Sequence, residues 1–486
     1  MPQTRSPSPG PHTSRRALLV GAAAAALAPD GAGAGTAAPS VPSPATPGSP
    51  VPSADAPRLA VGPRATRLRP EPAAETEVWC FDGRAVPPTL RVRHGEAVRL
   101  RVENGTPRPL SLHWHGVRNR NAMDGVGGVT QPPIASGGAF TYEFTPPDAG
   151  TFLIRPLVVG GASEPSGRGL AGMLVVEERA PPPVDRDLAL VVQDWRLEED
   201  GRPLPFGQTA FAAASGRLGN LVTVNGRPVP ETIELRPRAR VRLRIGNACN
   251  ARGTYLRFDG LKVYVAAVDG QPTDTFEPLR ATLPFPPGTR YDLVFDMPEA
   301  GAVGTVSALI GNGLVLARLA AVGDPIAGTR PPVAPIGENR ALPAEVKLQN
   351  ALRRDVVITG GATLDRDKPA AEPTFTGDPA RVWQVNGASG TAGAAPLFTA
   401  KRGQPVVLAI RNATAFAQAL HLHGHNFRLL HPLDDGWEPY WLDTFQLLEG
   451  RTARIAFLAD NPGRWLLAST VLERFDTGLW TSFEIT

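Results

Sequence analysis

Three histidines stand at alternate positions in the segment "ALHLHGHNF", namely His421, His423 and His425. A second alternating pair, His113 and His115, occurs in "SLHWHGV" in the first third of the chain. A strand advances ~3.3 Å per residue and alternates faces, so both members of an alternating pair project from one side. Imidazole is a good ligand for copper, zinc, iron or nickel. If the two strands meet, His113, His115, His421 and His423 face one gap and form a metal site.

A purely structural role is the alternative for these histidines. A lone buried histidine is usually a satisfied core residue, and one His-x-His pair is a weak signal. Two such pairs, each a short run after an "ENG" or "RNA" corner, favour metal binding over a structural remnant. His425 either extends the row or lies outside it. His94 and His431 have no partner motif and are expected at the surface or in turns, and His12 falls near the N-terminus.

Strands that could carry these pairs recur along the chain. Three segments alternate apolar and polar residues through two strands joined by a turn, and each ends in an Asn-containing corner. We interpret each segment as a β-hairpin, preceded by a shorter repeated motif such as "FDGRAVPPTLRV" or "VNGRPVPETIEL". A module repeated about every 150 residues predicts three similar β-domains. The three segments are "TLRVRHGEAVRLRVENGT" (89–106), "TIELRPRARVRLRIGNACN" (232–250) and "LFTAKRGQPVVLAIRNATA" (397–415).

Composition agrees with an all-β protein. The chain has 486 residues, in which 51 glycines and 52 prolines punctuate short alternating runs. No stretch of ~18 apolar residues predicts a mature membrane span. The formal net charge is +4 and the arginines are scattered, so nucleic acid is not an expected partner.

The N-terminus has the pattern of a twin-arginine export signal. Arg15 and Arg16 precede an uncharged, Ala-rich stretch in "TSRRALLVGAAAAALAP", which a disordered basic tail leaves unexplained. This route carries folded proteins, which suits a domain loaded with metal before export. The expected location is periplasmic, or otherwise exported through the twin-arginine pathway.

The predicted organisation is a signal and lead-in followed by three β-sandwich domains of Greek-key type. The boundaries are 1–57 for the signal and the Pro/Ala-rich lead-in, then 58–180, 181–335 and 336–486 for the domains. Two cysteines, Cys80 and Cys249, fall in different predicted domains and are expected to be buried thiols, with a bridge between them as the alternative.

The chain resembles the multicopper oxidases, a family built of three cupredoxin domains, over about residues 65–486. This resemblance implies an all-β fold of three consecutive cupredoxin-like Greek-key β-sandwich domains, with copper as cofactor. The motifs that carry it are "LSLHWHGVRNRNAMDGVGGVTQPPIASGGAFTYEFTPPDAGTF" (110–152), "HLHGHNFRLL" (421–430) and "WLDTFQLLEGRTARIAFLADNPGRW" (441–465).

The resemblance also implies roles for single residues. His113 and His421 fall where the family holds its type 2 copper, and His115 and His423 fall on ligands of the type 3 pair. Asp124, in "MDGV", falls where family members keep an acid that helps to move protons. A turn residue without a catalytic role is the alternative for Asp124.

The other copper ligands of the family are missing from this sequence. A serine replaces the thiolate that blue copper requires, a glutamine replaces one type 1 imidazole, and an arginine brings a positive charge to each copper region. We therefore expect no type 1 copper, no electron path to a three-copper cluster and no four-electron reduction of dioxygen. The departures are Arg155, Leu157, Gln418, Ala468, Ser469, Thr470, Arg474 and, at the weak axial position, Leu479.

Three hypotheses follow for the function. In the first, an exported member of the family binds one ion, copper or alternatively zinc, and serves copper handling or a limited redox reaction. In the second, the protein is a metal-free, non-enzymatic scaffold with a periplasmic protein partner, resembling the cell-division-associated members of the superfamily. In the third, it is a true oxidase with an unfamiliar electron route. The four retained histidines favour the first, and the lost thiolate counts heavily against the third.

Overall fold

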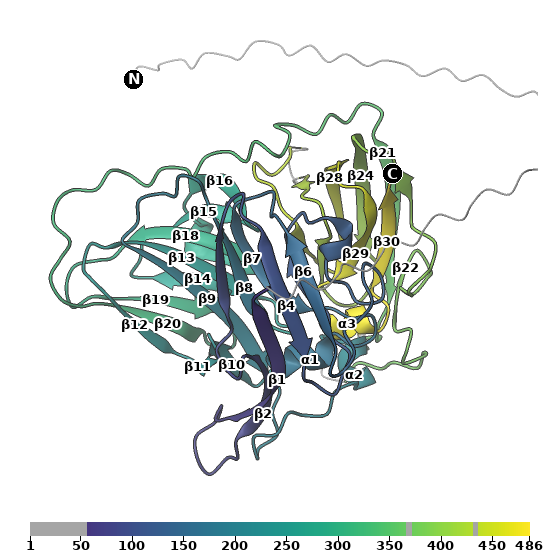
Figure 1. The fold of residues 1–486 in the computed structure, drawn as a ribbon, viewed down its shortest axis with the longest axis horizontal. Helices are drawn as coiled ribbons and strands as arrows, with labels where there is room; N and C mark the ends of the chain where they lie inside the picture. The colour runs from purple at the N-terminus through teal and green to yellow at the C-terminus, as the bar shows by residue number, and fades with distance from the viewer. Residues whose placement is uncertain (1–55, 366–371, 431–435) are drawn as a thin grey trace, which may run out of the picture. The chain divides into compact units, whose positions relative to one another are not determined.

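Strands dominate the described part of the chain, which in this computed structural model comprises residues 56–365, 372–430 and 436–486 (Figure 1). Sequence alternation explains them, as in β4 (Val98–Asn104), which buries Val98 and Leu100 and exposes Arg99 between them. The predicted export signal and most of the lead-in, residues 1–55, lie outside the described residues.

Residues 58–177, all of them described, form two sheets around one hydrophobic core. Side chains from both sheets, such as Val102, Trp114, Phe152 and Val176, belong to a single buried cluster, as in a β-sandwich. The sheet orders are β2–β1–β4–β6 and β3–β8–β7–β5. The remaining bounds are β1 Arg58–Thr66, β2 Thr76–Phe81, β3 Thr89–Arg93, β5 Leu112–His115, β6 Ala139–Phe144, β7 Gly150–Pro156 and β8 Gly172–Glu177.

Residues 186–321, also fully described, form a larger pair of sheets. Their orders are β11–β10–β9–β13–β18–β15–β16 and β12–β20–β19–β14–β17. The bounds are β9 Arg186–Trp195, β10 Leu221–Val224, β11 Arg227–Pro228, β12 Glu231–Leu235, β13 Arg240–Asn247, β14 Thr254–Asp259, β15 Tyr264–Val268, β16 Gln271–Phe276, β17 Thr282–Phe285, β18 Arg290–Asp296, β19 Val303–Ala308 and β20 Leu314–Ala321.

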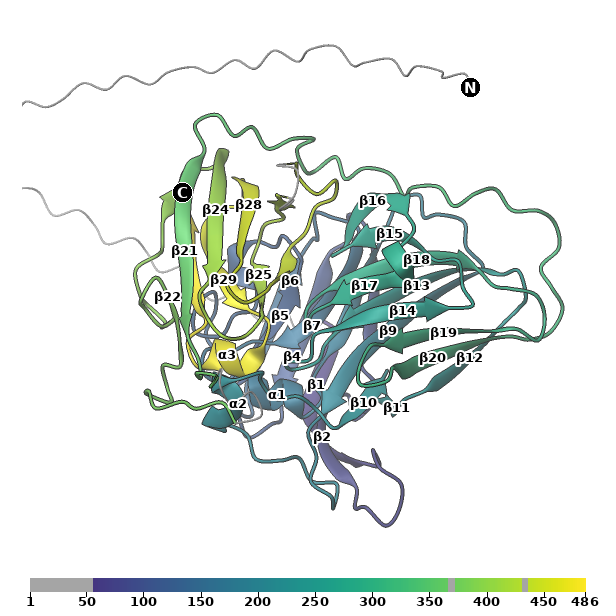
Figure 2. The same cartoon turned by 180° about the vertical axis from the view of Figure 1, so that it is seen from behind.

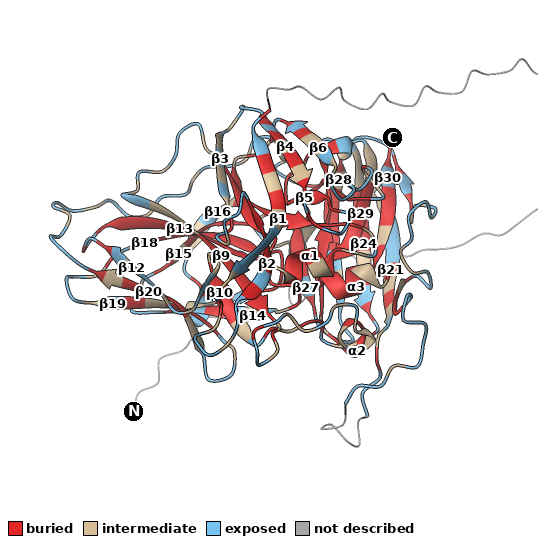
Figure 3. Ribbon diagram, turned by 60° about the horizontal axis from the view of Figure 1, so that its bottom comes forward, coloured by how far each residue is buried: buried red, intermediate tan, exposed pale blue. Residues whose placement is uncertain are grey.

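The described parts of residues 352–485 form a third pair of sheets, whose buried side chains continue the core of the second pair (Figure 3). Their orders are β22–β21–β24–β28–β26 and β23–β30–β29–β25–β27. The bounds are β21 Leu352–Gly360, β22 Trp383–Val385, β23 Thr399–Ala400, β24 Gln404–Asn412, β25 Gln418–Leu422, β26 Arg428–Leu429, β27 Thr444–Leu447, β28 Thr452–Ala459, β29 Gly463–Ser469 and β30 Trp480–Ile485.

The prediction that the two strands of each repeated segment pair as a hairpin is wrong. The two strands of each repeated segment exist, but β3 and β4 lie in different sheets, as do β12 and β13, and β23 and β24. β3 runs parallel to β8, whereas β4 pairs with β1 and β6. The turn between the two strands therefore carries the chain from one layer of the sandwich to the other.

A buried asparagine closes each of the three repeats. Asn104, Asn247 and Asn412 end β4, β13 and β24, and none is more than 1% exposed. In each, the side-chain NH₂ group donates to two backbone carbonyls, and the side-chain oxygen accepts the N–H of the residue two positions later. The Asn-containing corner predicted from sequence is thus the same hydrogen-bonded device in all three repeats.

The predicted domain boundaries fall between strands, and we keep the division into 58–180, 181–335 and 336–486 as a proposal. In the described residues 322–351 there is no strand. Three short helices, α1 (Ser163–Gly167), α2 (Thr209–Ala213) and α3 (Leu472–Asp476), one from each predicted domain, lie together (Figure 2). Among the described residues, none of the helices is long and apolar enough to cross a bilayer.

Candidate metal centre

Four histidines from opposite ends of the chain meet in one buried cluster. β5 carries His113 and His115, β25 carries His421, and His423 follows β25 by one residue. Ring centroids are 4.3 Å apart for His113 and His423, 5.5 Å for His113 and His421, and 3.9 Å for His115 and His421. Each of these four histidines is at most 2% exposed.

Strand pairing fixes where these side chains point. β5 pairs with β7, and β25 lies between β27 and β29, with His421 opposite Thr444 on one side and Ala468 on the other. Trp114, between the two histidines of β5, packs in the core of the first sandwich against the rings of Tyr142 and Phe144. The alternation read from the sequence therefore separates a core face from the histidine-bearing face.

Hydrogen bonds orient three of the imidazoles in the same way. The Nδ1 atom of His113 lies 2.8 Å from the backbone oxygen of Asp124, and that of His421 lies 2.9 Å from the backbone oxygen of Asp443. The Nδ1 atom of His423 lies 2.9 Å from Oδ2 of the Asp124 carboxylate. Because oxygen acceptors require a proton on Nδ1, the Nε2 atom of each ring keeps its lone pair for a ligand.

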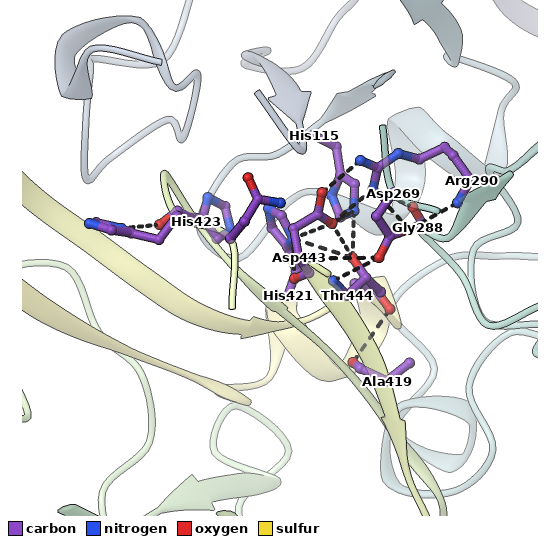
Figure 4. Close-up of polar contacts among 12 residues, drawn as sticks. His115, Asp269, Gly288, Arg290, Ala419, His421, His423, Asp443 and Thr444 are labelled. Atoms are coloured by element: carbon purple, nitrogen blue, oxygen red, sulfur yellow. Dashed lines mark hydrogen bonds and ion pairs between the residues drawn. The ribbon is translucent and has the colours of Figure 1, made fainter. Parts of the chain in front are cut away.

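The fourth imidazole belongs to a charged network next to the other three (Figure 4). His115 Nε2 lies 3.0 Å from Thr444 Oγ1, which donates to Asp443 Oδ1 at 2.8 Å. Arg290 donates two hydrogen bonds, of 2.8 and 2.6 Å, to the Asp443 carboxylate, and its Nη1 atom lies 3.4 Å from Oδ1 of Asp269. Asp269 in turn accepts the backbone N–H of Thr444.

Burial sets the protonation of the cluster. Burial lowers the pKa of His423 to about 3 and also lowers the pKa of His421 and, more strongly, of His115. Burial alone would raise the pKa of Asp124, but the adjacent rings of His423 and His113 outweigh it and lower that pKa below its ordinary value. At neutral pH His115, His421 and His423 are therefore uncharged beside an ionised carboxylate, the protonation states in which these groups bind metals.

Two groups of donor atoms in the described residues have the spacing of a metal site. His113, His421 and His423 each offer a ring nitrogen, and these atoms lie within 4.8 Å of one another. His115, His421 and Asp443 form a second such group. His421 belongs to both groups, so the two are parts of one cluster. This donor set fits one ion held by two to four imidazoles.

The remaining histidines lie elsewhere. His425 is outside the row, with its ring among Phe457, Trp465 and Phe483. His94 is half-buried, with Nε2 2.9 Å from the carbonyl oxygen of Pro147. His12 and His431 fall outside the described residues.

Both cysteines, Cys80 and Cys249, are buried and free. Burial raises the pKa of each thiol. The alternative of a bridge between them does not occur.

Arg474 stands where the resemblance implies a type 1 copper ligand, and its guanidinium is bonded to other groups. Arg474 donates through Nη1 to Gln418 Oε1 at 2.5 Å and to the carbonyl of Ala417 at 2.7 Å, and through Nη2 to the carbonyl of Ala214 at 2.8 Å. Burial lowers its pKa to about 10, so the guanidinium stays charged at neutral pH. Ser469 uses its hydroxyl oxygen to accept the N–H of Val471. Blue copper does not fit these residues.

A second arginine occupies the type 3 region. Arg155 lies directly opposite His113 in the β5–β7 pair, and its guanidinium donates to the carbonyls of Cys249 and Thr470. Burial lowers its pKa to about 10, which leaves it charged, and its Nε atom has no hydrogen-bond partner among the residues that the structure describes. A trinuclear copper cluster therefore does not fit this site.

Sequence reasoning assigned no role to Asp443, Thr444, Asp269 or Arg290. The first two stand in the quoted "WLDTF" motif and reach the histidines because β27 pairs with β25. Asp269 and Arg290 come from the second predicted domain, which contains no histidine, and only the folded chain brings them to the site.

Comparison with known proteins bears out the family. Family models described as multicopper oxidase match residues 64–181, 190–305 and 365–486. The chain belongs to the multicopper oxidase family. The predicted resemblance and the all-β, cupredoxin-like fold are thereby confirmed.

Proteins similar to this chain include multicopper oxidases and a cell division protein. A crystal structure of a multi-copper oxidase from Pseudomonas thermotolerans is 32% identical, covers 88% of this chain and 98% of its own, and superposes with a TM-score of 0.77. Multicopper oxidase MmcO of Mycobacterium tuberculosis is 28% identical over 418 residues, 79% of each chain. Cell division protein FtsP of Actinobacillus succinogenes is 30% identical over 241 residues, 47% of this chain and 49% of its own.

Proposed function

We propose that this multicopper-oxidase-family protein holds one transition-metal ion at His113, His421 and His423, with His115 as a further ligand. Copper is the preferred ion, because imidazole sites bind Cu²⁺ more tightly than the other divalent metals of the first row, and zinc is the alternative. The role is copper handling or a limited redox reaction, without laccase-type turnover.

One observation carries this proposal. The Nε2 atoms of His113 and His421 are buried and have no hydrogen-bond partner within the described residues. A buried polar atom left unpaired costs about 1–3 kcal/mol, so two adjacent ones point to a ligand that satisfies both. A metal ion does so directly, since each Nε2 carries a lone pair while Nδ1 is held by an oxygen.

The groups bonded to the rings support a metal-ligand role. The carboxylates of Asp124 and Asp443 lie against the rings, and Arg155 and Arg290 match their two negative charges. Metal-ligating histidines commonly donate their second ring nitrogen to a carboxylate or a backbone carbonyl, which is the arrangement found here. Asp124 is then a positioning residue for His423, and the proton-relay role predicted for it stays a proposal.

Export is part of the same proposal. The paired Arg15 and Arg16 and the uncharged run after them support transfer through the twin-arginine pathway to the periplasm or its equivalent. In the mature protein we propose no membrane span and no nucleic-acid partner.

The test is metal analysis of protein purified from copper-supplemented cells, combined with electron paramagnetic resonance. We expect one copper per chain with a type 2 spectrum, and a higher melting temperature in the loaded than in the chelator-treated protein. His113→Ala and His421→Ala should lose both signals. His94→Ala is the matched control, because that ring bonds the Pro147 carbonyl and belongs to neither group of donor atoms, so the variant should keep both signals.

The second candidate is a metal-free scaffold that binds a periplasmic protein. The similarity to cell division protein FtsP over about half of the chain favours it. Protein that stays free of copper and zinc after loading, with an unchanged melting temperature, would decide for the scaffold and against the metal site.

A further inference from the structure

A cavity of about 330 Å³ opens between the second and third predicted domains, beside the histidine cluster. Its lining includes Thr444, the residue that contacts His115 and His421, but none of the histidines. Its volume falls in the range of about 300–1,000 Å³ that is usual for small-molecule pockets. The mechanism proposed above gives this cavity no role.

Aromatic rings form much of its wall. Phe276, at the end of β16, stacks on Tyr440 with ring centroids 5.8 Å apart and an interplanar angle of 13°. Tyr291 also lines the cavity, and its hydroxyl donates to the carbonyl of Pro284 at 2.6 Å, which holds the ring in place. Tyr255, 48% exposed, completes the set near solvent. Each stacked ring has one face against its neighbour, and an aromatic face left uncovered in such a wall attracts a cation.

The charge around the cavity is negative. Among the described residues that line it, two are acids, Asp269 and Glu438, and none is lysine or arginine. Behind the wall Arg290 pairs with both Asp269 and Asp443. Burial and the neighbouring Asp443 carboxylate raise the pKa of Asp269 to about 7, so the net charge of these three groups at neutral pH lies between zero and one negative charge.

Two neighbouring groups agree with this sign. Burial, together with the carboxyls of Glu438 and Asp269, raises the pKa of Tyr440 to about 12. The guanidinium of Arg428 lies 4.6 Å from the centroid of the Trp441 ring and donates to the backbone oxygen of Glu438. Arg428 is not part of the lining, and it contacts the backbone of Glu438, not its carboxylate.

We propose that this cavity binds a small organic cation, a substituted ammonium ion of the choline type, against the rings of Phe276 and Tyr440 with the Glu438 carboxylate at its rim. Aromatic walls with carboxylates and no basic side chain recognise such ions and disfavour anions, while a bare metal ion would find no imidazole or thiolate here. The proposal is independent of metal binding at the histidines.

The experiment measures choline binding by isothermal titration calorimetry, with 3,3-dimethylbutan-1-ol as the uncharged molecule of the same shape. We expect choline to bind about 5- to 30-fold more tightly than the alcohol, the ratio that a desolvated cation–π contact gives. Tyr440→Leu should weaken choline binding by a similar factor. Tyr440→Phe keeps the ring and should bind within about threefold of the unmodified protein.

Glu438→Gln removes the rim charge and should weaken choline binding while leaving that of the alcohol unchanged. Glu338→Gln, an exposed acid outside the cavity, is the matched control and should change neither. Equal binding of choline and the alcohol, no binding of choline, or equal loss in the two glutamate variants would each overturn the proposal. Far-ultraviolet circular dichroism of each variant establishes that a loss of binding is not a loss of fold.

Discussion

The carboxylate of Asp124 is the sharpest point at which to test the metal site. In Asp124→Asn the backbone oxygen that holds His113 remains, because it belongs to the main chain. The carboxylate loses its negative charge at the bond of 2.9 Å from His423 Nδ1 to Oδ2 and at the longer contact of 3.4 Å between His113 Nδ1 and Oδ1. Replacing such a partner of a metal-bound histidine typically costs about 10- to 100-fold in metal affinity, or roughly 1.4–2.7 kcal/mol. Removing the imidazole itself in His423→Ala should cost more.

The assay is competition for Cu²⁺ and for Zn²⁺ against a chelator of known affinity, at pH 7. Asp194→Asn is the matched control, since Asp194 is also buried and accepts hydrogen bonds from Arg252 and the backbone N–H of Gly219 in place of a histidine. It should lose stability without losing metal affinity. Unchanged affinity in Asp124→Asn, or an equal loss in both variants, would refute the assignment of Asp124 as the residue that positions His423.

Three further predictions concern the framework. Burial raises the pKa of Glu473 to about 7, above its value of ~4.5 in an unfolded chain, so ionised Glu473 destabilises the fold at high pH. In urea unfolding, the stability of Glu473→Gln relative to the unmodified protein should therefore rise by up to about 3 kcal/mol between pH 4.5 and 8. A stability difference that does not change with pH would contradict this. Ser469→Cys alone should show no blue absorption band with copper, because Arg474 stays in place, whereas its combination with Gln418→His and Arg474→His should show one. Asn412→Ala leaves two buried carbonyls without donors and should cost about 2–5 kcal/mol in the same unfolding assay; a loss under 1 kcal/mol would be too small for this account.

Much of the fold was accessible from the sequence because it depends on local periodicity. The alternation in residues 89–106 marks two strands, and the Asn104 corner recurs at Asn247 and Asn412 with the same hydrogen bonds. The pairing of those strands was not accessible. A hairpin and a crossover between layers have the same alternating pattern, and the choice depends on partners far along the chain, such as β8 for β3.

The candidate site divides in the same way. The two His-x-His pairs name their four residues, since a period of two puts alternate side chains on one face. The network behind them does not follow from spacing: Asp443 and Thr444 arrive through the neighbouring strand β27, and Arg290 arrives from a domain without histidines. The sequence shows that Arg474 replaces a ligand of the family. It does not show that Arg474 donates to three carbonyl and amide oxygens, because those acceptors come close only in the folded chain.

The cluster joins rings that are more than 300 positions apart in the chain, and His113 and His421 are 308 positions apart. Until ribosomal synthesis reaches position 421, the proposed site has only the two imidazoles of His113 and His115, which would bind an ion weakly. Under the proposed function, metal occupancy would therefore report a complete and correctly folded chain, because a truncated or C-terminally misassembled product would stay empty.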